Sequence, residues 1–98
     1  MAQFIALLRR NLDEFSESQF TPELMEAEAE RARRLYGDGF TRQIWSRGDH
    51  PGAAMVLEAA SADEARAALG TLPLVQNGML LLDILVPVNP YRGFLPRG

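Results

Sequence analysis

Glu28 is the residue whose position best suits acid–base chemistry. On a helical wheel its carboxylate falls inside the apolar arc of the segment 22–36, among leucine, methionine and alanine side chains. Burial disfavours the charged form of a carboxylate, so it would raise the pKa toward the value that a general acid or base needs near neutral pH. The alternative is a solvated helix edge, on which Glu28 pairs with Arg31 or with an arginine of another element.

Arg42 and His50 are the other candidates for catalysis. Arg42 lies in a predicted strand with Phe40 and Ile44 on the same face, so its guanidinium could point beside the helix and hold a carboxylate through two hydrogen bonds. The alternative is a structural ion pair between Arg42 and Glu28. His50 lies in a predicted turn and has the only side chain whose unperturbed pKa lies near neutrality. An ordinary surface histidine is the alternative.

Two aromatic residues are candidates for substrate binding. Trp45 falls on the opposite face of the predicted strand from Arg42, where it either contacts a ligand or packs in a core or an interface. Tyr36 ends the apolar arc of the helix, and it either donates a hydrogen bond into a cavity or only packs.

The composition excludes several kinds of catalytic and metal site. The sequence has no cysteine and a single histidine, which excludes thiol nucleophiles, zinc–thiolate sites and iron–sulfur clusters and argues against a histidine-rich metal centre. It has no lysine for a Schiff base, and it lacks a phosphate-binding glycine loop, a serine nucleophile elbow and a helix with two metal ligands. We therefore expect no metal and no cofactor, and catalysis should be acid–base in kind.

Charge and hydropathy limit the partners. Ten arginines against 13 acidic residues give a net charge of −3, the opposite of what a nucleic-acid-binding surface needs. The longest apolar stretches, residues 4–8 and 79–82, are far shorter than the ~20 residues of a membrane span, and the N-terminus lacks the features of a signal peptide. We expect a small-molecule substrate, no nucleic-acid or membrane partner, and a cytoplasmic location.

A strand, a loop and a long helix are predicted in the first part of the chain. Residues 3–8 read QFIALL, a short apolar run that suits a buried strand, whereas residues 11–20 have no sustained period and are predicted as a loop. The helix begins after the N-cap Thr21, has proline in its first position and runs through residues 22–36 to a pair of glycines.

A hairpin, a second helix and a last strand follow. Residues 40–47 and 53–58 are rich in aromatic, β-branched and apolar types, and they flank a cluster of turn formers. Ser61 opens the capping box SADE and so starts a helix, which Pro73 is expected to end. Residues 79–86 form the most apolar run of the chain and are predicted as a strand that is buried on both faces.

The order of these elements predicts an α+β fold. Strand, helix, strand, strand, helix, strand is the ferredoxin-like βαββαβ order, in which two helices cover one face of a four-stranded antiparallel sheet. The other face should be polar, yet three of the four strands are apolar at nearly every position. A second copy of the sheet is the available cover, which predicts a dimeric α+β barrel. Residues 1–98 are expected to form a single domain, with residues 87–98 as an extended C-terminal arm because they include three prolines and two glycines.

Short motifs along the chain resemble those of the muconolactone delta-isomerase family. The stretch GFTRQIWSRGDHPG, a strand after it, and a capped helix that begins SADEA and ends in LPL carry the resemblance. The first strand, with FIAL where the family is polar and basic, and the tail NPYRGFLPRG depart from the family pattern. The matching residues are Glu28, Glu30, Gly39, Arg42, Trp45, His50, Ser61 and Leu72-Pro73-Leu74.

The resemblance implies a ferredoxin-like dimeric α+β barrel, assembled as a homodimer or a larger ring of dimers. It also implies a cofactor-free isomerase that shifts a proton and a double bond within an unsaturated lactone from aromatic-compound breakdown. Glu28 would then be the base and Arg42 the group that holds the substrate's carboxylate, with His50 and Trp45 lining the site. Two alternatives share the architecture: a cofactor-free oxygenase-type enzyme acting on a cyclic substrate, and a non-catalytic dimer that binds a small molecule.

Overall fold

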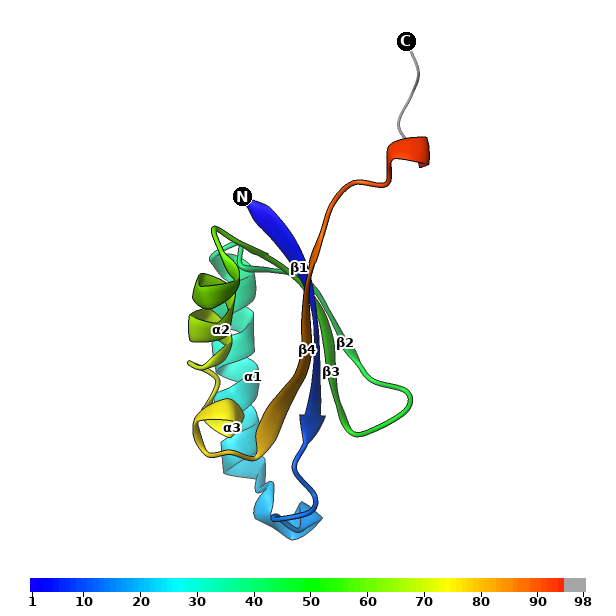
Figure 1. Ribbon diagram of the computed structural model, residues 1–98. Coiled ribbons are helices and arrows are strands. Elements are labelled where there is room, and N and C mark those ends of the chain that lie inside the picture. The colour runs from blue at the N-terminus through cyan, green and yellow to red at the C-terminus, as the bar shows by residue number, and fades with distance from the viewer. Residues whose placement is uncertain (95–98) are drawn as a thin grey trace.

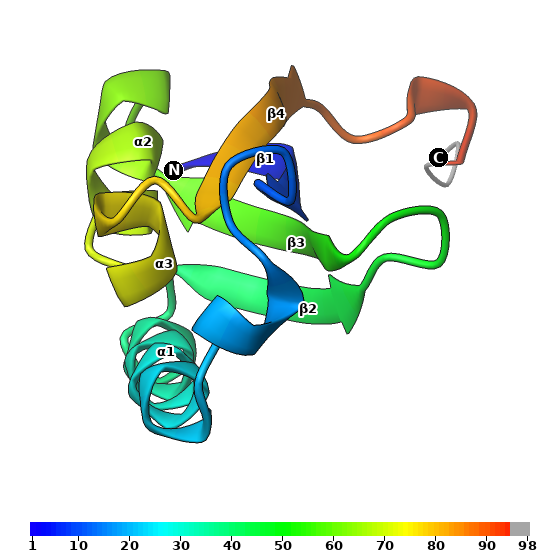
Figure 2. The same ribbon diagram turned by 90° about the horizontal axis from the view of Figure 1, so that it is seen from below.

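The computed structural model describes residues 1–94 and contains one four-stranded antiparallel sheet with helices on one of its faces (Figure 1, Figure 2). The strand order is β2-β3-β1-β4, so the predicted ferredoxin-like α+β fold is confirmed. No helix within residues 1–94 is long and apolar enough to cross a membrane. The elements are β1 (Ala2–Arg10), α1 (Pro22–Gly37), β2 (Thr41–Ser46), β3 (Gly52–Ala59), α2 (Ala62–Leu69), α3 (Pro73–Gln76) and β4 (Leu80–Val88), with short 3₁₀ helices at Glu17–Gln19 and Arg92–Phe94.

Helix α1 begins where its capping residues predict. The side-chain oxygen of Thr21 accepts a hydrogen bond from the Leu24 N–H at 3.3 Å, and Pro22 occupies the first turn, where a missing N–H costs nothing. Leu35 is buried on the side that faces the sheet, while Glu30 and Arg34 are exposed on the other side. The helix therefore presents one face, which includes Glu28, toward the interior of the fold.

The core lies between the sheet and the helices. Alternate residues of β1, namely Phe4, Ala6 and Leu8, face the helices and are at most 3% exposed. Met55 of β3 is equally buried beside them. Because side chains alternate along a strand, Arg10 at the end of β1 also lies on the helix side.

The chain after α2 differs from the prediction that Pro73 ends the second helix. Helix α2 ends at Leu69 with Gly70 as its C-cap, and Pro73 instead begins α3. Proline starts a helical turn without leaving an unpaired N–H, so the same residue type that breaks one helix can begin another. This short helix brings the Leu74 N–H against α1.

Two strands contain an extra residue that interrupts the alternation of faces. The pairing of β2 with β3 shifts between Thr41 and Gln43, which leaves Arg42 without a partner residue. The pairing of β1 with β4 shifts in the same way and leaves Asp83 without one. A bulge of this kind exchanges the faces to which all later side chains of the strand point.

The face of the sheet away from the helices, which we call the outer face, is apolar. It carries Ile5, Trp45, Ile84 and Val86, whose exposed fractions lie between 41% and 62%. In the single chain the last strand is thus covered on one face only, and the predicted burial of its second face requires a cover from outside the chain.

The C-terminal segment leaves the sheet after β4. Pro87 and Val88 still belong to the strand, so the segment outside regular structure begins two residues later than expected. It leads away from the sheet to the 3₁₀ helix Arg92–Phe94 (Figure 1). Residues 95–98 of the expected arm lie outside the described residues.

Gly52 begins β3 at a point where two backbones nearly touch. A Cβ at this position would clash with the carbonyl oxygen of Leu8 and would lie 2.8 Å from the Cα of Arg9. We expect Gly52→Ala to lower the free energy of unfolding by about 1–3 kcal/mol, the usual cost of overpacking, in urea denaturation. Gly48→Ala is the control, because nothing lies within 4 Å of the added Cβ. Equal stability of the two variants would contradict the close approach.

Candidate active site

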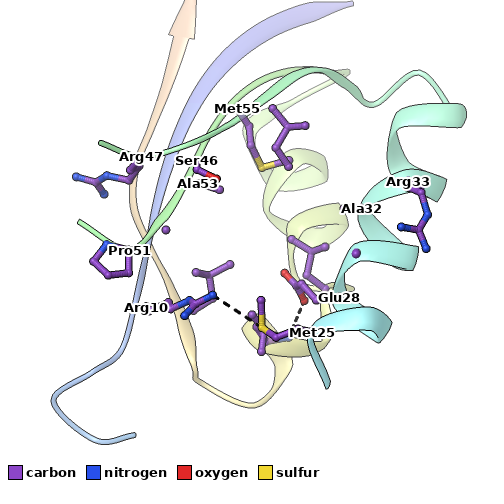
Figure 3. A pocket seen from close by; sticks show the side chains of 16 residues that line it. Arg10, Met25, Glu28, Ala32, Arg33, Ser46, Arg47, Pro51, Ala53 and Met55 are labelled. Carbon is purple, nitrogen blue, oxygen red and sulfur yellow. Dashed lines mark hydrogen bonds between the residues drawn. The ribbon is translucent and has the colours of Figure 1, made fainter. Parts of the chain in front are cut away.

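A cavity of about 560 Å³ lies between α1 and the helix-facing side of the sheet, next to the β2–β3 hairpin (Figure 3). This volume is typical of small-molecule sites, as is the mostly apolar lining with a few polar groups. The apolar walls include Met25, Ala29, Ala32, Ile44, Met55 and Leu80.

Glu28 is the carboxylate of this cavity. It is half-buried on α1, and its Oε1 accepts a hydrogen bond of 2.9 Å from the backbone N–H of Leu74 at α3. Burial raises the pKa of Glu28 above its ordinary value, while the hydrogen bond from Leu74 opposes part of this rise. The side chain is therefore oriented by the backbone and also holds its proton more tightly than a solvated glutamate does.

The alternative of a solvated ion pair is not what surrounds Glu28. Arg31, the proposed partner, donates from Nε to Oγ1 of Thr71 at 2.9 Å instead. No ion pair among residues 1–94 involves Glu28. The acidic group thus has no ion-pair partner in a mostly apolar cavity, which is the arrangement that tunes a carboxyl group for proton transfer.

Arg47, directly after β2, belongs to a network of ion pairs beside the cavity. Its guanidinium donates two hydrogen bonds to Asp49, at 2.9 and 2.7 Å, and one to Asp83 at 3.1 Å. Asp83 also accepts one of 2.8 Å from Arg9. Arg47 holds the pKa of Asp49 well below its usual range. The network links the hairpin to β1 and β4 and thereby fixes one wall of the cavity.

Arg42 does not point into the space beside α1, so that prediction is wrong. The bulge places Thr41 and Ile44 on the helix side, and the guanidinium of Arg42 lies 3.9 Å from the carboxylate of Glu58. The Arg42 side chain is 55% exposed. A simple alternation of faces had put Arg42 together with Ile44, and the extra residue in the strand separates them.

The other three predicted site residues lie outside the cavity lining. His50 is exposed in the β2–β3 turn, where its backbone N–H donates to Asp49. Trp45 is 62% exposed on the outer face, and Tyr36 is 61% exposed at the end of α1. Of the five predicted residues, only Glu28 lines the cavity of its own chain. Roles for His50, Trp45 and Tyr36 stay predictions.

Arg10 and Ser46 also line the cavity, and sequence reasoning missed both. The predicted first strand ended at residue 8, so Arg10 was left outside it. The signal for it was present, because Phe4, Ala6 and Leu8 set an alternation that continues to position 10. The same signal was present for Ser46, because it alternates with Ile44, which was predicted to lie on the face beside the helix.

No family model and no curated protein matches the sequence itself. A crystal structure of muconolactone isomerase matches the fold with a TM-score of 0.76 over 98% of this chain and 97% of that chain, at 19% identity. The chain has the fold of muconolactone isomerase. A second match, 5-chloro-2-hydroxyhydroquinone dehydrochlorinase from Burkholderia phenoliruptrix in complex with 2,5-dihydroxybenzoquinone, has a TM-score of 0.60 and 16% identity, covering 91% of this chain and 92% of that one.

The muconolactone isomerase fold was the one implied by the short sequence motifs. The match covers nearly the whole chain, including the first strand, where the sequence departs from the family pattern. The TM-scores of 0.76 and 0.60 establish the shared architecture, whereas identities of 19% and 16% leave the reaction open.

The raised pKa of Glu28 makes the stability of the protein depend on pH in a defined direction. The folded state binds this proton more tightly than the unfolded chain, so the stabilising contribution is full below the unfolded pKa and is lost as the pH rises through the folded one. Glu28→Gln keeps an acceptor oxygen for the Leu74 N–H but cannot titrate. We expect the free energy of unfolding of the wild type, relative to this variant, to fall as the pH rises from 4.5 toward neutrality, in urea denaturation at several pH values.

The control for this experiment is Glu30→Gln, which removes one carboxylate from the exposed side of the same helix. Stability curves of the wild type and Glu28→Gln that stay parallel over this pH range would contradict the burial of a titrating carboxyl group.

Proposed function

We propose that this protein is a cofactor-free isomerase that moves a proton and a double bond within an unsaturated lactone, with Glu28 as its acid–base group. The observation that carries the proposal is a half-buried carboxyl group of raised pKa, held by the Leu74 N–H inside a mostly apolar cavity. The likeness of the whole fold to muconolactone isomerase supports the same reaction class.

The reaction needs one group that both takes and returns a proton. The carboxylate of Glu28 removes the proton from the carbon next to the lactone carbonyl, and the electron pair of that C–H bond moves into an enolate. The protonated Glu28 then gives the proton to the far end of the conjugated system, and the double bond shifts. Nothing is oxidised or reduced overall. The raised pKa of Glu28 makes its carboxylate a stronger base toward the C–H bond in the first half-reaction.

The apolar walls of the cavity contribute to this chemistry. Ile44 and Met55 from the sheet and Met25 and Ala32 from α1 surround the space beside the carboxyl group. Removing water strengthens every electrostatic interaction in the cavity and prevents an enolate from taking a proton from solvent at random.

A homodimer formed through the outer face belongs to the same proposal. Exposed Ile5, Ile84 and Val86 share this face with Trp45, and an apolar sheet face of this kind is normally covered. Two such sheets packed face to face would bury these side chains in a common core. The ion pair between Arg9 and Asp83 lies beside the apolar residues of the outer face and would limit how far the apolar contact extends.

The second candidate is a dimer of the same architecture that is either a cofactor-free oxygenase-type enzyme acting on a cyclic substrate or a non-catalytic protein that binds a small molecule. It is favoured by the second structural match, whose bound ligand is a dihydroxybenzoquinone. An oxygenase-type reaction or simple binding would not require Glu28 to exchange a proton with carbon, so this residue discriminates between the candidates.

Glu28→Gln tests the proposed reaction. Incubation of an unsaturated lactone in D₂O with the wild type should shift the double bond and incorporate deuterium at the far end of the conjugated system, where Glu28 returns the proton, both followed by NMR. We expect the variant to lower kcat by about 100- to 10,000-fold, the usual contribution of a general base, with little change in KM. Glu30→Gln, on the exposed side of α1, should retain activity. Unchanged turnover by Glu28→Gln would exclude the proposed mechanism.

A substitution on the outer face tests the homodimer. We expect the wild type to have twice its chain mass of 10.9 kDa in light scattering, and Ile84→Glu to have the mass of one chain because a charge is costly in a sheet-to-sheet core. Leu12→Glu, the same kind of change at an exposed leucine outside the sheet, is the control and should leave the mass unchanged. A wild type with the mass of a single chain in light scattering would refute the dimer.

A further inference from the structure

Three arginines line the cavity, and they differ in whether a carboxylate pairs with their charge. Arg47 is paired with Asp49 and Asp83, and Arg33 with Glu26 at 2.8 Å. Arg10 takes part in no ion pair among residues 1–94. In Figure 3, Arg33 and Arg47 point away from Glu28, whereas Arg10 points into the cavity toward Met25 and Glu28.

Apolar and weakly polar groups hold the guanidinium of Arg10 in place. It stacks over the ring of Phe20 at 4.7 Å from the centroid, and its Nη2 lies 4.0 Å from the sulfur of Met25. Its backbone N–H donates to the carbonyl of Pro51 at 2.8 Å, which fixes the end of β1. These contacts orient the cation and leave its charge uncompensated, although a half-buried charge gains most from a charged partner.

Glu28 does not supply that partner. Its Oε1 is occupied by the Leu74 N–H, and the causes that shift its pKa are burial and this hydrogen bond, with no arginine among them. The cavity therefore holds a proton-transfer group and a free cation, separated by the side chain of Met25 (Figure 3).

We infer that Arg10 is the anion-binding residue of this cavity, and that the ligand is a small acid with one carboxylate and an apolar body. The guanidinium can hold a carboxylate through two parallel hydrogen bonds, which fixes the orientation of the ligand as well as its charge. The apolar body then lies along Met25, Ala29 and Ile44, next to Glu28. That this ligand is the substrate rests on the proposed function, but its binding to Arg10 does not.

This inference gives Arg10 the role that the sequence had suggested for Arg42. Arg42 is paired with Glu58 away from the cavity, whereas Arg10 lines the same cavity as the acid–base group. A ligand anchored at Arg10 presents its other end to Glu28, so Arg10 acts as a specificity-determining residue.

Binding of two probes with the same carbon skeleton tests the inference without any turnover. Trans-cinnamate carries a carboxylate, and cinnamamide carries a neutral amide in its place. We expect the wild type to bind cinnamate at least about tenfold more tightly than cinnamamide in titrations followed by NMR, since a charge-assisted pair of hydrogen bonds is lost with the amide. Arg10→Gln should lose this preference and keep its affinity for cinnamamide, which also reports that the cavity is folded.

Three further variants complete the experiment. Arg10→Lys should retain part of the preference, because it keeps the charge but not the planar fork. Arg33→Gln, a cavity arginine already paired with Glu26, should retain all of it. Glu28→Gln should bind cinnamate at least as well as the wild type, so a failed isomerisation assay and a failed anion site are distinguishable. A wild type without preference for cinnamate, or an Arg10→Gln variant that keeps the preference, would overturn the inference.

Discussion

The site depends on keeping one carboxyl group partly out of water without neutralising it. Burial between α1 and the rest of the fold raises the proton affinity of Glu28, and the hydrogen bond from the Leu74 N–H lowers it by less while fixing the orientation of the group. An arginine in that place would have held Glu28 ionised and made it a weaker base. A backbone N–H orients the carboxyl group without adding a full charge. The four-residue helix α3 supplies this donor.

The arginines at the ends of β1 and β2 stay apart from Glu28 because other groups surround each of them. Arg47 is engaged by Asp49 and Asp83, so its charge ties the hairpin to the sheet instead of acting in the cavity. Arg10 leaves β1 on the helix side and meets an aromatic ring and a thioether. Because neither arginine forms an ion pair with Glu28, the carboxyl group of Glu28 and the guanidinium of Arg10 can line one cavity without neutralising each other's charge.

The sequence predicted the order of elements, the capped start of α1 and the inward position of Glu28, because all three depend on local periodicity and capping chemistry. It failed wherever a single residue changed the register. Arg42 was placed by strict alternation, which the bulge in β2 breaks, and Pro73 was taken as an end although it begins a turn. Arg10 was missed for a different reason. The alternation of β1 predicts that it faces the helices, but its lack of an ion-pair partner depends on the tertiary positions of all the carboxylates.

The bulge at Arg42 also affects how this chain is aligned with its structural relatives. Residues before and after it face the helices with a spacing of three rather than two, as Thr41 and Ile44 do. An ungapped alignment with a regular strand would transfer roles between opposite sides of the sheet. Equivalent positions along β2 are therefore found by superposing backbones and allowing one inserted residue, and at 19% identity this single insertion decides which side chains are compared.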